Sequence, residues 1–521
     1  MASTPATRPA RPPHTPLARV AEVAGAVRAP EAPEVAVTGL TLDSRRVQPG
    51  DLYAALPGAR AHGADFSLQA AAAGAVAVLT DAEGAERSAV REAGLPVVLV
   101  DDARAVLGRV AALVYDHPAE ALRTIGVTGT QGKTTVTRLL EAALLASGVR
   151  SAVVGTVGTR IAGQDLATSL TTPEAPDLHG LFARMRELEV QACALEISSH
   201  ALVLGRVDGV VVDVAVFTNL GRDHLDFHVD MEDYYAAKAS LFTPERSRRA
   251  VVCVDDEHGR RLAGEVAATS VPVRTYGVSE RAAGADYRAV DVESGPTGSR
   301  FTVLGPDGLR LQSAVALPGA FNVANALAVV AAAAEAGLDP AAVAAALPGV
   351  GGVPGRLERV VAPSATDRPQ PTVVVDYAHK PDAVEAVLRT LRPLTRGRLV
   401  VVIGAGGDRD RGKRPLMGRL AAALADEVVV TDDNPRSEDP ASIRAEVLAG
   451  AADGPAVVRE EGDRERAITG AILGAAPDDV VLVAGKGHET GQEVAGTVHP
   501  FDDREVARAA LAARASQEDP R

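Results

Sequence analysis

The stretch from Arg123 to Ser147 reads RTIGVTGTQGKTTVTRLLEAALLAS. Its first seven residues are typical of a buried strand, and the glycine loop after them leads into a helix that we expect from about Lys133 to Ser147. Glycines let backbone N–H groups approach phosphates, a lysine contacts the β and γ oxygens, and a threonine hydroxyl ligates Mg²⁺. The stretch therefore predicts a nucleotide site made of Gly129, Thr130, Gln131, Gly132, Lys133, Thr134 and Thr135, although Val127 occupies the first glycine position of the strict phosphate-loop spacing.

The chain around this loop predicts an α/β protein of three domains. A single core rarely grows past about 250 to 300 residues, so 521 residues predict two or three domains. Strands rich in Val and Ala alternate with helices, which favours parallel sheets. We expect a disordered leader over residues 1–32, a small α/β domain over 33–120, a central ATPase-like parallel-sheet domain over 121–354, and a Rossmann-like doubly wound domain over 355–521, whose ligands lie beyond the strand ends.

Composition excludes several classes of protein. The net charge of −14 argues against non-specific nucleic-acid binding and against attachment to anionic membranes. No secretory h-region and no uncharged run of membrane-spanning length is present, so we expect no membrane insertion and a cytoplasmic protein. The two cysteines, Cys193 and Cys253, lie in apolar runs and are expected to be buried free thiols.

Lysine is rare in this chain. Five of the 54 basic residues are lysines, and the rest are arginines. Solubility accepts either base, so the remaining lysines are candidates for sites that need a compact ammonium group which can lose its proton. The alternative explanation is that a genome-wide compositional bias replaced most lysines and that the remaining five are accidental. The five are Lys133, Lys238, Lys380, Lys413 and Lys486.

Two further strands end in polar clusters. The run QACALEISSH carries Glu196 at its end, and VVVDVAVFTN is followed by DHLDFH, which contains His224. If these strand ends are adjacent, Glu196, His224 and the hydroxyl of Thr134 supply ligands for one or two Mg²⁺ ions. Taken alone, DHLDFH fits equally well a solvated loop or a transition-metal site.

The order of these motifs resembles the Mur ligase family of ATP-dependent amide-forming enzymes. TGTQGKTT, EISSH, the DHLD segment, YYAAKASLF, FNVANALA, PGRLE, DYAHKPDA, GGDRDRGKRP, DDNPR and AGKGHE follow one another from about residue 120 to 490. The resemblance implies a ligase that adds diaminopimelate to UDP-N-acetylmuramoyl-L-Ala-D-Glu in peptidoglycan synthesis, with ATP as co-substrate and Mg²⁺ as cofactor. We also expect a monomer, although the sequence leaves the oligomeric state undecided.

The resemblance assigns residues to each substrate. ATP would contact the loop, Asn325, Arg356 and Asp376, and Mg²⁺ would be held by Thr134, Glu196, His224 and Lys238 as its carbamate (N6-carboxylysine). Lys133, Glu196, His224 and Lys238 would be the catalytic group. The uridine would lie at Leu42 and Ser44, within TLDSRRVQPGDLY, and the muramoyl dipeptide along Thr171, Thr172, Ser198 and Arg206. Gln131 stands where many relatives have Asn, and Leu204 where some have a glutamine.

Within that family, DDNPR decides the incoming amino acid. Diaminopimelate differs from lysine by a second carboxylate, which a guanidinium pairs through two charge-assisted hydrogen bonds. Arg436, helped by Asn434 and Arg409, is therefore expected to select diaminopimelate, and Glu489 with the Gly485 backbone to receive its distal ammonium. The amino-acid site comprises Arg409, Asp433, Asn434, Pro435, Arg436, Gly485 and Glu489.

Three other functions remain open from the sequence. An L-lysine-adding ligase of the same family and a folylpolyglutamate synthase-like ligase share the reaction type, and a catalytically inactive regulator would share the fold. The N-terminal domain and DDNPR disfavour the folylpolyglutamate synthase, and the four intact catalytic residues disfavour the regulator. The meso and LL isomers of diaminopimelate carry the same charges, so the sequence leaves the isomer undecided.

Overall fold

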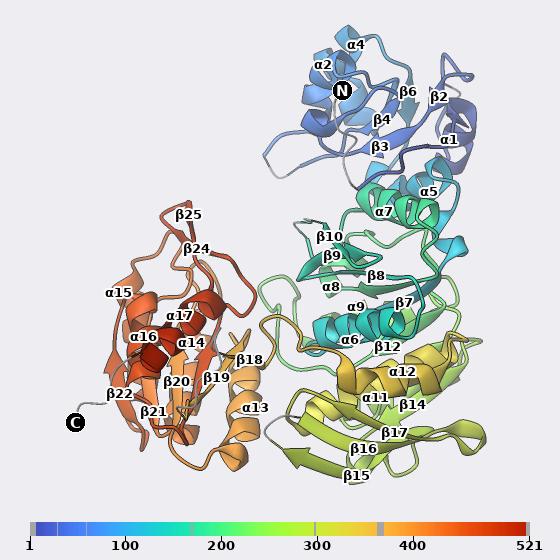
Figure 1. Cartoon of the computed structure of the whole chain (residues 1–521). Helices are drawn as coiled ribbons and strands as arrows, with labels where there is room; N and C mark the ends of the chain where they lie inside the picture. The colour runs from blue at the N-terminus through green and yellow to red at the C-terminus, as the bar shows by residue number, and fades with distance from the viewer. Residues whose placement is uncertain are drawn as a thin grey trace. The chain divides into compact units, whose positions relative to one another are not determined.

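The computed structural model describes residues 7–28, 30–58, 60–166, 168, 170–295, 298–361 and 369–516 (Figure 1). The chain divides into two compact units. The first unit comprises residues 1–220, 232–287 and 328–343, and the second comprises residues 221–231, 288–327 and 344–521. In the described residues no helix is both long enough and apolar enough to cross a membrane.

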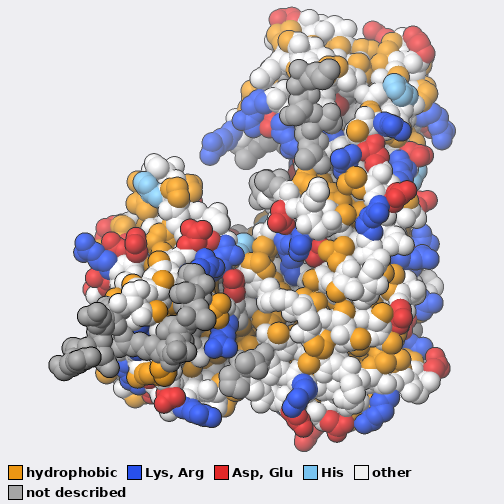
Figure 2. All heavy atoms as spheres, viewed as in Figure 1, with side chains coloured by type: hydrophobic (Ala, Val, Ile, Leu, Met, Phe, Trp, Pro, Cys, Tyr) orange, Lys and Arg blue, Asp and Glu red, His pale blue; other side chains and the backbone are white. Residues whose placement is uncertain are grey.

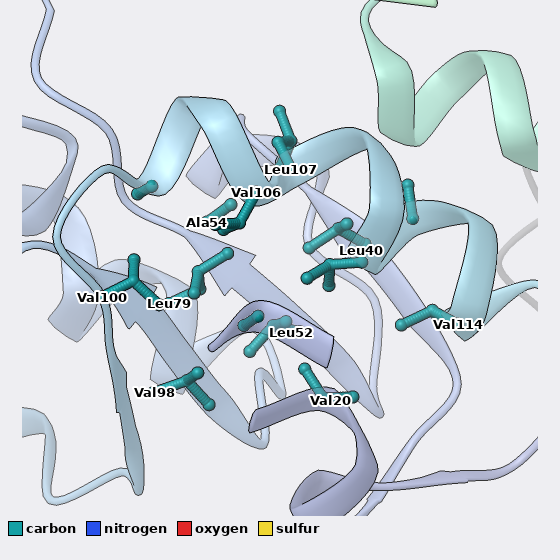
Figure 3. Packing of buried hydrophobic residues seen from close by; sticks show 14 of the residues in the cluster. Val20, Leu40, Leu52, Ala54, Leu79, Val98, Val100, Val106, Leu107 and Val114 are labelled. Carbon is teal, nitrogen blue, oxygen red and sulfur yellow. The ribbon is translucent and has the colours of Figure 1, made fainter. Parts of the chain in front are cut away.

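The first unit begins with a four-stranded parallel sheet. Its strands run in the order β3 (Gly39–Thr41), β4 (Asp51–Ala54), β5 (Ala77–Thr80) and β6 (Val97–Leu99). Alternate side chains of a strand face opposite sides of a sheet, so Leu40, Leu52, Leu79 and Val98 share one face. The helices α1 (Leu17–Ala24) and α5 (Ala103–Val114) cover that face, and Val106 of α5 packs into the core (Figure 3).

The other face of this sheet carries a smaller core, in which Tyr53 and Val78 are buried. Three short helices lie in the connections between these strands: α2 (Ser67–Ala72) between β4 and β5, and α3 (Ala82–Ala85) and α4 (Ser88–Ala93) between β5 and β6. The small N-terminal α/β domain expected from the sequence is therefore present.

The expected disordered leader is wrong for residues 15–24. Strand β1 (Thr15–Pro16) pairs antiparallel with β2 (Ala36–Val37), and α1 buries Leu17 and Val20 completely. Burying two such side chains contributes roughly 1.5–3 kcal/mol each. The prediction missed helix α1 because its apolar residues form a short stripe on one helical face, and many Pro and Arg residues surround that stripe in the sequence.

A second sheet in the first unit carries the phosphate loop. Its parallel core has the order β8, β11, β7, β12, β13, β14, and β9 and β10 extend it in antiparallel fashion beyond β8. The strand bounds are β7 (Arg123–Thr128), β8 (Ser151–Gly155), β9 (Gly158–Ile161), β10 (Gln164–Leu166), β11 (Ala192–Glu196), β12 (Val214–Phe217), β13 (Ala250–Cys253) and β14 (Val273–Gly277). Cys193 and Cys253 are buried free thiols, as expected.

Helices connect these parallel strands. They are α6 (Lys133–Ala146), α7 (Ala175–Glu187), α8 (Ser199–Val203), α9 (Met231–Ala239) and α10 (Glu257–Ala267), followed by α11 (Ala320–Glu335) and α12 (Pro340–Ala346). The helix after the phosphate loop begins at Lys133, as predicted, and ends one residue before the expected Ser147.

The second unit contains a six-stranded sheet in the order β18, β19, β23, β20, β21, β22. All neighbours except the β18 edge strand are parallel. The bounds are β18 (Glu358–Val360), β19 (Thr372–Asp376), β20 (Leu399–Ile403), β21 (Glu427–Val430), β22 (Val457–Glu460) and β23 (Val480–Ala484). This is the doubly wound arrangement that the sequence predicts for residues 355–521.

Helices flank this sheet. Helices α16 (Arg464–Leu473) and α17 (Asp503–Ser516) bury Ile468 and Leu511 against Val375 and Val402. Helices α13 (Pro381–Leu391), α14 (Lys413–Leu424) and α15 (Pro440–Ala451) pack side by side. The unit also contains the antiparallel strands β15 (Tyr287–Gly295), β16 (Gly298–Leu304) and β17 (Arg310–Val315), and the hairpin β24 (Gly491–Val494) and β25 (Thr497–Pro500). On the face seen in Figure 2, acidic and basic side chains are intermixed.

Candidate functional site

The phosphate loop is the turn between β7 and α6. Gly129 and Gly132 have φ values of 147° and 87°, a backbone region that favours glycine. A Cβ on Gly129 would collide with the hydroxyl of Thr218, so the close approach also requires glycine. The Lys133 ammonium donates to the carbonyls of Gly129 (2.7 Å) and Thr130 (3.1 Å), which folds the side chain over the loop.

The neighbouring strand β12 holds this loop in shape. The amide oxygen of Asn219 accepts a hydrogen bond from the Gln131 N–H (2.9 Å), and the Thr218 hydroxyl donates to the Gln131 carbonyl (2.6 Å). The Thr130 N–H donates to the Asn219 carbonyl (2.9 Å). Gln131 thus contributes its backbone to the loop, and the Asn-to-Gln departure noted from the sequence leaves these bonds intact.

Lys238 reaches the same loop from α9. Its side chain is buried, and its ammonium donates to the Gly129 carbonyl (3.0 Å) and lies 4.4 Å from the ring centroid of Tyr234. The Tyr234 hydroxyl in turn lies 3.2 Å from the hydroxyl of Thr130. The structure therefore brings Lys133 and Lys238 together at one carbonyl, although they are far apart in the sequence.

Thr134 and Glu196 also come together. The Glu196 carboxylate at the end of β11 accepts a hydrogen bond from the Thr134 hydroxyl (3.0 Å), and both residues are buried. Thr156, which follows β8, donates to both carboxylate oxygens, through its N–H (2.9 Å) and its hydroxyl (3.0 Å). Adjacent parallel strands place their carboxyl ends at one edge, which is why residues this far apart in sequence meet.

This donor set fits magnesium. Within the described ranges no group of three or more His, Cys, Asp or Glu side chains lies close enough to hold a metal ion. Magnesium needs no such group, because it prefers oxygen ligands and takes one or two carboxylates together with waters and substrate phosphates. The paired hydroxyl of Thr134 and carboxylate of Glu196 beside a phosphate loop match that pattern.

His224 lies in the second unit. Its φ of 53° is uncommon for a residue with a side chain, and its Nε2 lies 3.0 Å from a carboxylate oxygen of Asp223. The same carboxylate pairs with the ammonium of Lys380. Strained backbone of this kind clusters at functional sites.

The residues expected at the nucleotide substrate lie in the first unit. Leu42 is partly buried, and the Ser44 hydroxyl donates to the side-chain carbonyl of Gln69 (2.9 Å). The Thr171 hydroxyl lies 3.1 Å from that of Thr156, which connects it to the Glu196 cluster.

Thr172, Ser198 and Arg206 form a second part of this site. The Thr172 hydroxyl donates to the Glu196 carbonyl (2.8 Å), and Ser198 caps α8 by accepting from the Ala201 N–H (3.1 Å). The Arg206 guanidinium donates to Glu174 (2.8 Å) and to the Thr172 carbonyl (3.4 Å). Leu204 directly follows α8.

Three residues expected at ATP lie in the second unit. Asp376 ends β19, where its carboxylate accepts from the Leu357 N–H (2.7 Å). Burial raises the pKa of Asp376, and the nearby Arg356 guanidinium partly offsets this. Arg356 lies 4.6 Å from the ring centroid of Tyr377, while Asn325 is on α11, where its amide donates to Asn322 (3.1 Å).

The segment after β21 carries DDNPR. Arg436 has a φ of 53° and is held by backbone hydrogen bonds to the β24 hairpin, from its N–H to the Glu493 carbonyl (3.0 Å) and from the Ala495 N–H to its own carbonyl (2.7 Å). Its guanidinium donates to the Gly407 carbonyl (2.6 Å). A Cβ on Gly407 would collide with the carbonyl of Pro435, so this part of the chain is closely packed.

The segment after β23 meets DDNPR. The Asn434 amide donates to the Glu489 carboxylate (2.9 Å), and Gly485, with a φ of 122°, lies beside Asp433. Asp433 is buried, whereas Arg409 lies on an exposed turn and makes no hydrogen bond within the described residues. The structure thus brings together six of the seven residues expected at the amino acid.

Four residues near these sites were not expected from the sequence as binding or positioning residues: Asn219, Thr156, Glu174 and Arg464. Arg464 is fully buried, pairs with Asp503 (2.7 Å), and donates to the carbonyls of Asp432 (3.2 Å) and Ala484 (3.0 Å), which join the two segments that carry the residues expected at the amino acid. Each of these residues lies next to a motif, but its contact is across strands and is not visible in a linear pattern.

Comparison with known proteins identifies the family. Models of the Mur ligase family catalytic domain, the Mur ligase middle domain, and the Mur ligase glutamate ligase domain match residues 36–115, 127–333 and 355–487. The chain is 57% identical to the UDP-N-acetylmuramoyl-L-alanyl-D-glutamate--2,6-diaminopimelate ligase of Streptomyces coelicolor, covering 91% of this chain and 92% of that protein. It is 51% identical to the enzyme of the same name from Corynebacterium glutamicum, covering 91% and 92%.

A solved structure agrees with this comparison. The structure titled UDP-N-acetylmuramoyl-L-alanyl-D-glutamate--2,6-diaminopimelate ligase superposes with a TM-score of 0.67 at 33% identity, covering 97% of this chain and all of that one. Such similarity over nearly the whole length, together with the geometry of the loop and strand ends, leads to one conclusion. This chain belongs to the Mur ligase family.

Proposed function

We propose that this chain is an ATP-dependent ligase that adds diaminopimelate to UDP-N-acetylmuramoyl-L-Ala-D-Glu in peptidoglycan synthesis. The observation that carries the proposal is the 57% identity over 91% of the chain to the Streptomyces coelicolor ligase whose name states these substrates. The products are the UDP-linked tripeptide, ADP and phosphate. A diaminopimelate-adding activity also agrees with an arginine at Arg436, where a second carboxylate needs a partner.

In the proposed reaction an oxygen of the D-Glu carboxylate attacks the γ-phosphorus of ATP. The bond to the β–γ bridging oxygen breaks, ADP leaves, and an acyl phosphate forms. An amine of diaminopimelate then attacks the acyl carbon, the C–N bond forms, the C–O bond to phosphate breaks, and the amine loses a proton. Positioning and charge stabilisation supply most of the acceleration of such reactions.

The phosphate loop performs the first of these tasks. Its backbone N–H groups and the Lys133 ammonium bind and orient the phosphates of ATP at the N-terminus of α6. Thr134 and Glu196 would hold one Mg²⁺ and His224 a second, and these ions would supply charge neutralisation when bound. Asn325, Asp376 and Arg356 are proposed to contact the adenine, the ribose and the phosphates.

Lys238 is proposed to act as a carbamate. Its ammonium and that of Lys133 both donate to the Gly129 carbonyl, so two like charges share one acceptor. Carbamylation would turn the second cation into an anion, remove this repulsion, and supply a bidentate oxygen ligand for a metal. Arginine cannot undergo this conversion, which agrees with the retention of lysine at this position.

The nucleotide substrate is proposed to extend over Leu42, Ser44, Thr171, Thr172, Ser198 and Arg206. Glu174 orients the Arg206 guanidinium, and Thr156 connects Thr171 to Glu196. We further propose domain limits near residues 33–120, 121–354 and 355–521, supported by the separate family matches to each part. A cytoplasmic enzyme is proposed because ATP is the co-substrate, and we propose that it acts as a monomer.

Phosphate release tests the proposal. ATP, Mg²⁺ and UDP-N-acetylmuramoyl-L-Ala-D-Glu are supplied with meso-diaminopimelate, LL-diaminopimelate or L-lysine. Turnover with one or both diaminopimelates and not with lysine is the expected result, and it also identifies the isomer. Turnover with lysine alone would favour the lysine-adding ligase, and turnover with none would contradict the proposal.

A further inference from the structure

Lys486 is a fully buried lysine with no role in the reaction described above. It lies two residues after β23, between Gly485 and Gly487, and its side chain has an exposed fraction of 0%. A buried ammonium costs several kcal/mol unless charged partners surround it. Its partners should therefore show why a lysine is kept here.

The ammonium of Lys486 lies among three side chains of the proposed amino-acid site. It donates to the amide oxygen of Asn434 (2.9 Å) and to the Glu489 carboxylate (3.2 Å). An oxygen of Asp433 lies 3.7 Å away. Two carboxylates that would repel each other thus share one cation between them.

These contacts determine how the Asn434 amide is turned. Its oxygen accepts from Lys486 and also from the Glu493 N–H (3.0 Å), so two donors define the oxygen side. The amide nitrogen must then face the other way, and it donates to Glu489 (2.9 Å). Without Lys486, rotating the Asn434 amide by 180° would break one hydrogen bond fewer on its oxygen side. The rotated amide would then point its oxygen, and no longer its N–H group, at the Glu489 carboxylate.

The same contacts orient Glu489. Its Oε2 atom accepts from both Lys486 and Asn434. Its Oε1 atom accepts no hydrogen bond from any residue in the described parts of the chain. The carboxylate is therefore clamped through one oxygen, and the other oxygen is left for a ligand.

We propose that Lys486 is a positioning residue for the incoming amino acid: it clamps Glu489 and Asn434 so that Oε1 of Glu489 receives an ammonium group of diaminopimelate. The inference rests on the proposed function, and it adds a residue that contacts no substrate atom itself. A compact ammonium suits this task because it donates in three directions from one point, which a planar guanidinium does not.

The Lys486→Met variant tests the clamp through three Michaelis constants. We expect the KM for diaminopimelate to rise about 10- to 100-fold, by analogy with the range found when the hydrogen-bond partners of metal ligands are removed. The KM values for ATP and the UDP-linked dipeptide should change by less than about twofold. An unchanged KM for diaminopimelate, or an equal rise in all three constants, would overturn the proposal.

A double-mutant cycle with Glu489→Gln separates positioning from a loss of stability. If Lys486 acts through Glu489, then Lys486→Met adds little to the KM already raised by Glu489→Gln. A general structural role predicts that the two effects multiply. Lys486→Gln, which keeps one donor without the charge, is the second variant if methionine impairs folding, and its KM should lie between wild type and Lys486→Met.

The Arg436→Met variant makes the two proposals distinguishable. If Arg436→Met leaves the use of diaminopimelate unchanged, the proposed amino-acid site is wrong. If Arg436→Met raises the KM for diaminopimelate and Lys486→Met does not, the site stands and the role of Lys486 is wrong.

Discussion

The phosphate loop and the proposed amino-acid site are built in different ways. The loop consists of consecutive residues, Gly129 to Thr135, at the start of one helix. The amino-acid site joins two segments that are far apart in sequence, since Asn434 and Glu489 are 55 positions apart. Local backbone geometry forms the first, whereas buried ion pairs and side-chain hydrogen bonds form the second. The loop should therefore tolerate changes in its surroundings better than the amino-acid site does.

The largest effect is expected at the loop itself. Lys133→Met removes the ammonium that folds over the Gly129 carbonyl and that we propose binds the transferring phosphoryl group. We expect kcat to fall about 10³-fold, the upper range for loss of one electrostatic group in a transition state. Steady-state phosphate release measures it. Arg123→Met, on an exposed side chain at the other end of β7, is the control and should keep wild-type turnover.

The amino-acid site is tested by Arg436→Met. Loss of two charge-assisted hydrogen bonds to the second carboxylate should lower kcat/KM for diaminopimelate about 10²-fold. Activity with L-lysine, which lacks that carboxylate, should change much less. Arg459→Met removes an arginine paired with Glu427 on the same sheet and serves as the control. An equal loss for both amino acids would contradict the assigned selectivity.

Stability in acid should depend on His179 in the first unit. Complete burial lowers the pKa of His179 to about 4, below its ordinary value of 6.5. The unfolded chain therefore binds a proton between these values that the folded chain does not, so stability falls as pH falls through 6.5 towards 4. From pH 7 to pH 5 this histidine alone should cost about 2 kcal/mol.

Denaturant titration at several pH values checks this slope. His179→Phe should remove that part of the pH dependence, while His499→Gln, on an exposed hairpin residue, should leave it in place. An unchanged slope in His179→Phe would contradict the lowered pKa of this ring.

The smallest effect concerns Thr156. Thr156→Val removes one hydroxyl donor to Glu196 and keeps the backbone donor, so the carboxylate should be held less well. We expect the Mg²⁺ concentration for half-maximal activity to rise about 10-fold. Thr156→Ser keeps the hydroxyl and should behave as wild type. Equal Mg²⁺ dependence in the wild type and both variants would show that the Thr156 hydroxyl does not support Mg²⁺ binding by Glu196.

The same contrast explains what the sequence could predict. The strand, loop and helix around Lys133 follow from glycine placement and apolar periodicity, and all three were predicted at nearly the observed positions. Helix α1 was missed because its apolar stripe is short and surrounded by Pro and Arg. The antiparallel strands β15 to β17 carry no motif and were not predicted.

Site residues divide in a similar way. Lys133, Glu196, Arg436 and Glu489 stand in motifs that a linear reading finds. Asn219 and Thr156 act through hydrogen bonds to residues on neighbouring strands, so their contributions depend on strand order and register. Lys486 was noticed as one of five lysines, but only the fold shows that its partners are side chains of the amino-acid site.

The most direct test of the central claim is a competition experiment. The enzyme, ATP, Mg²⁺ and UDP-N-acetylmuramoyl-L-Ala-D-Glu are incubated with equal concentrations of diaminopimelate and L-lysine, and mass spectrometry identifies the product. The account predicts a UDP-linked tripeptide that contains diaminopimelate, with the lysine product at the level of background. A product that contains mainly lysine would contradict it.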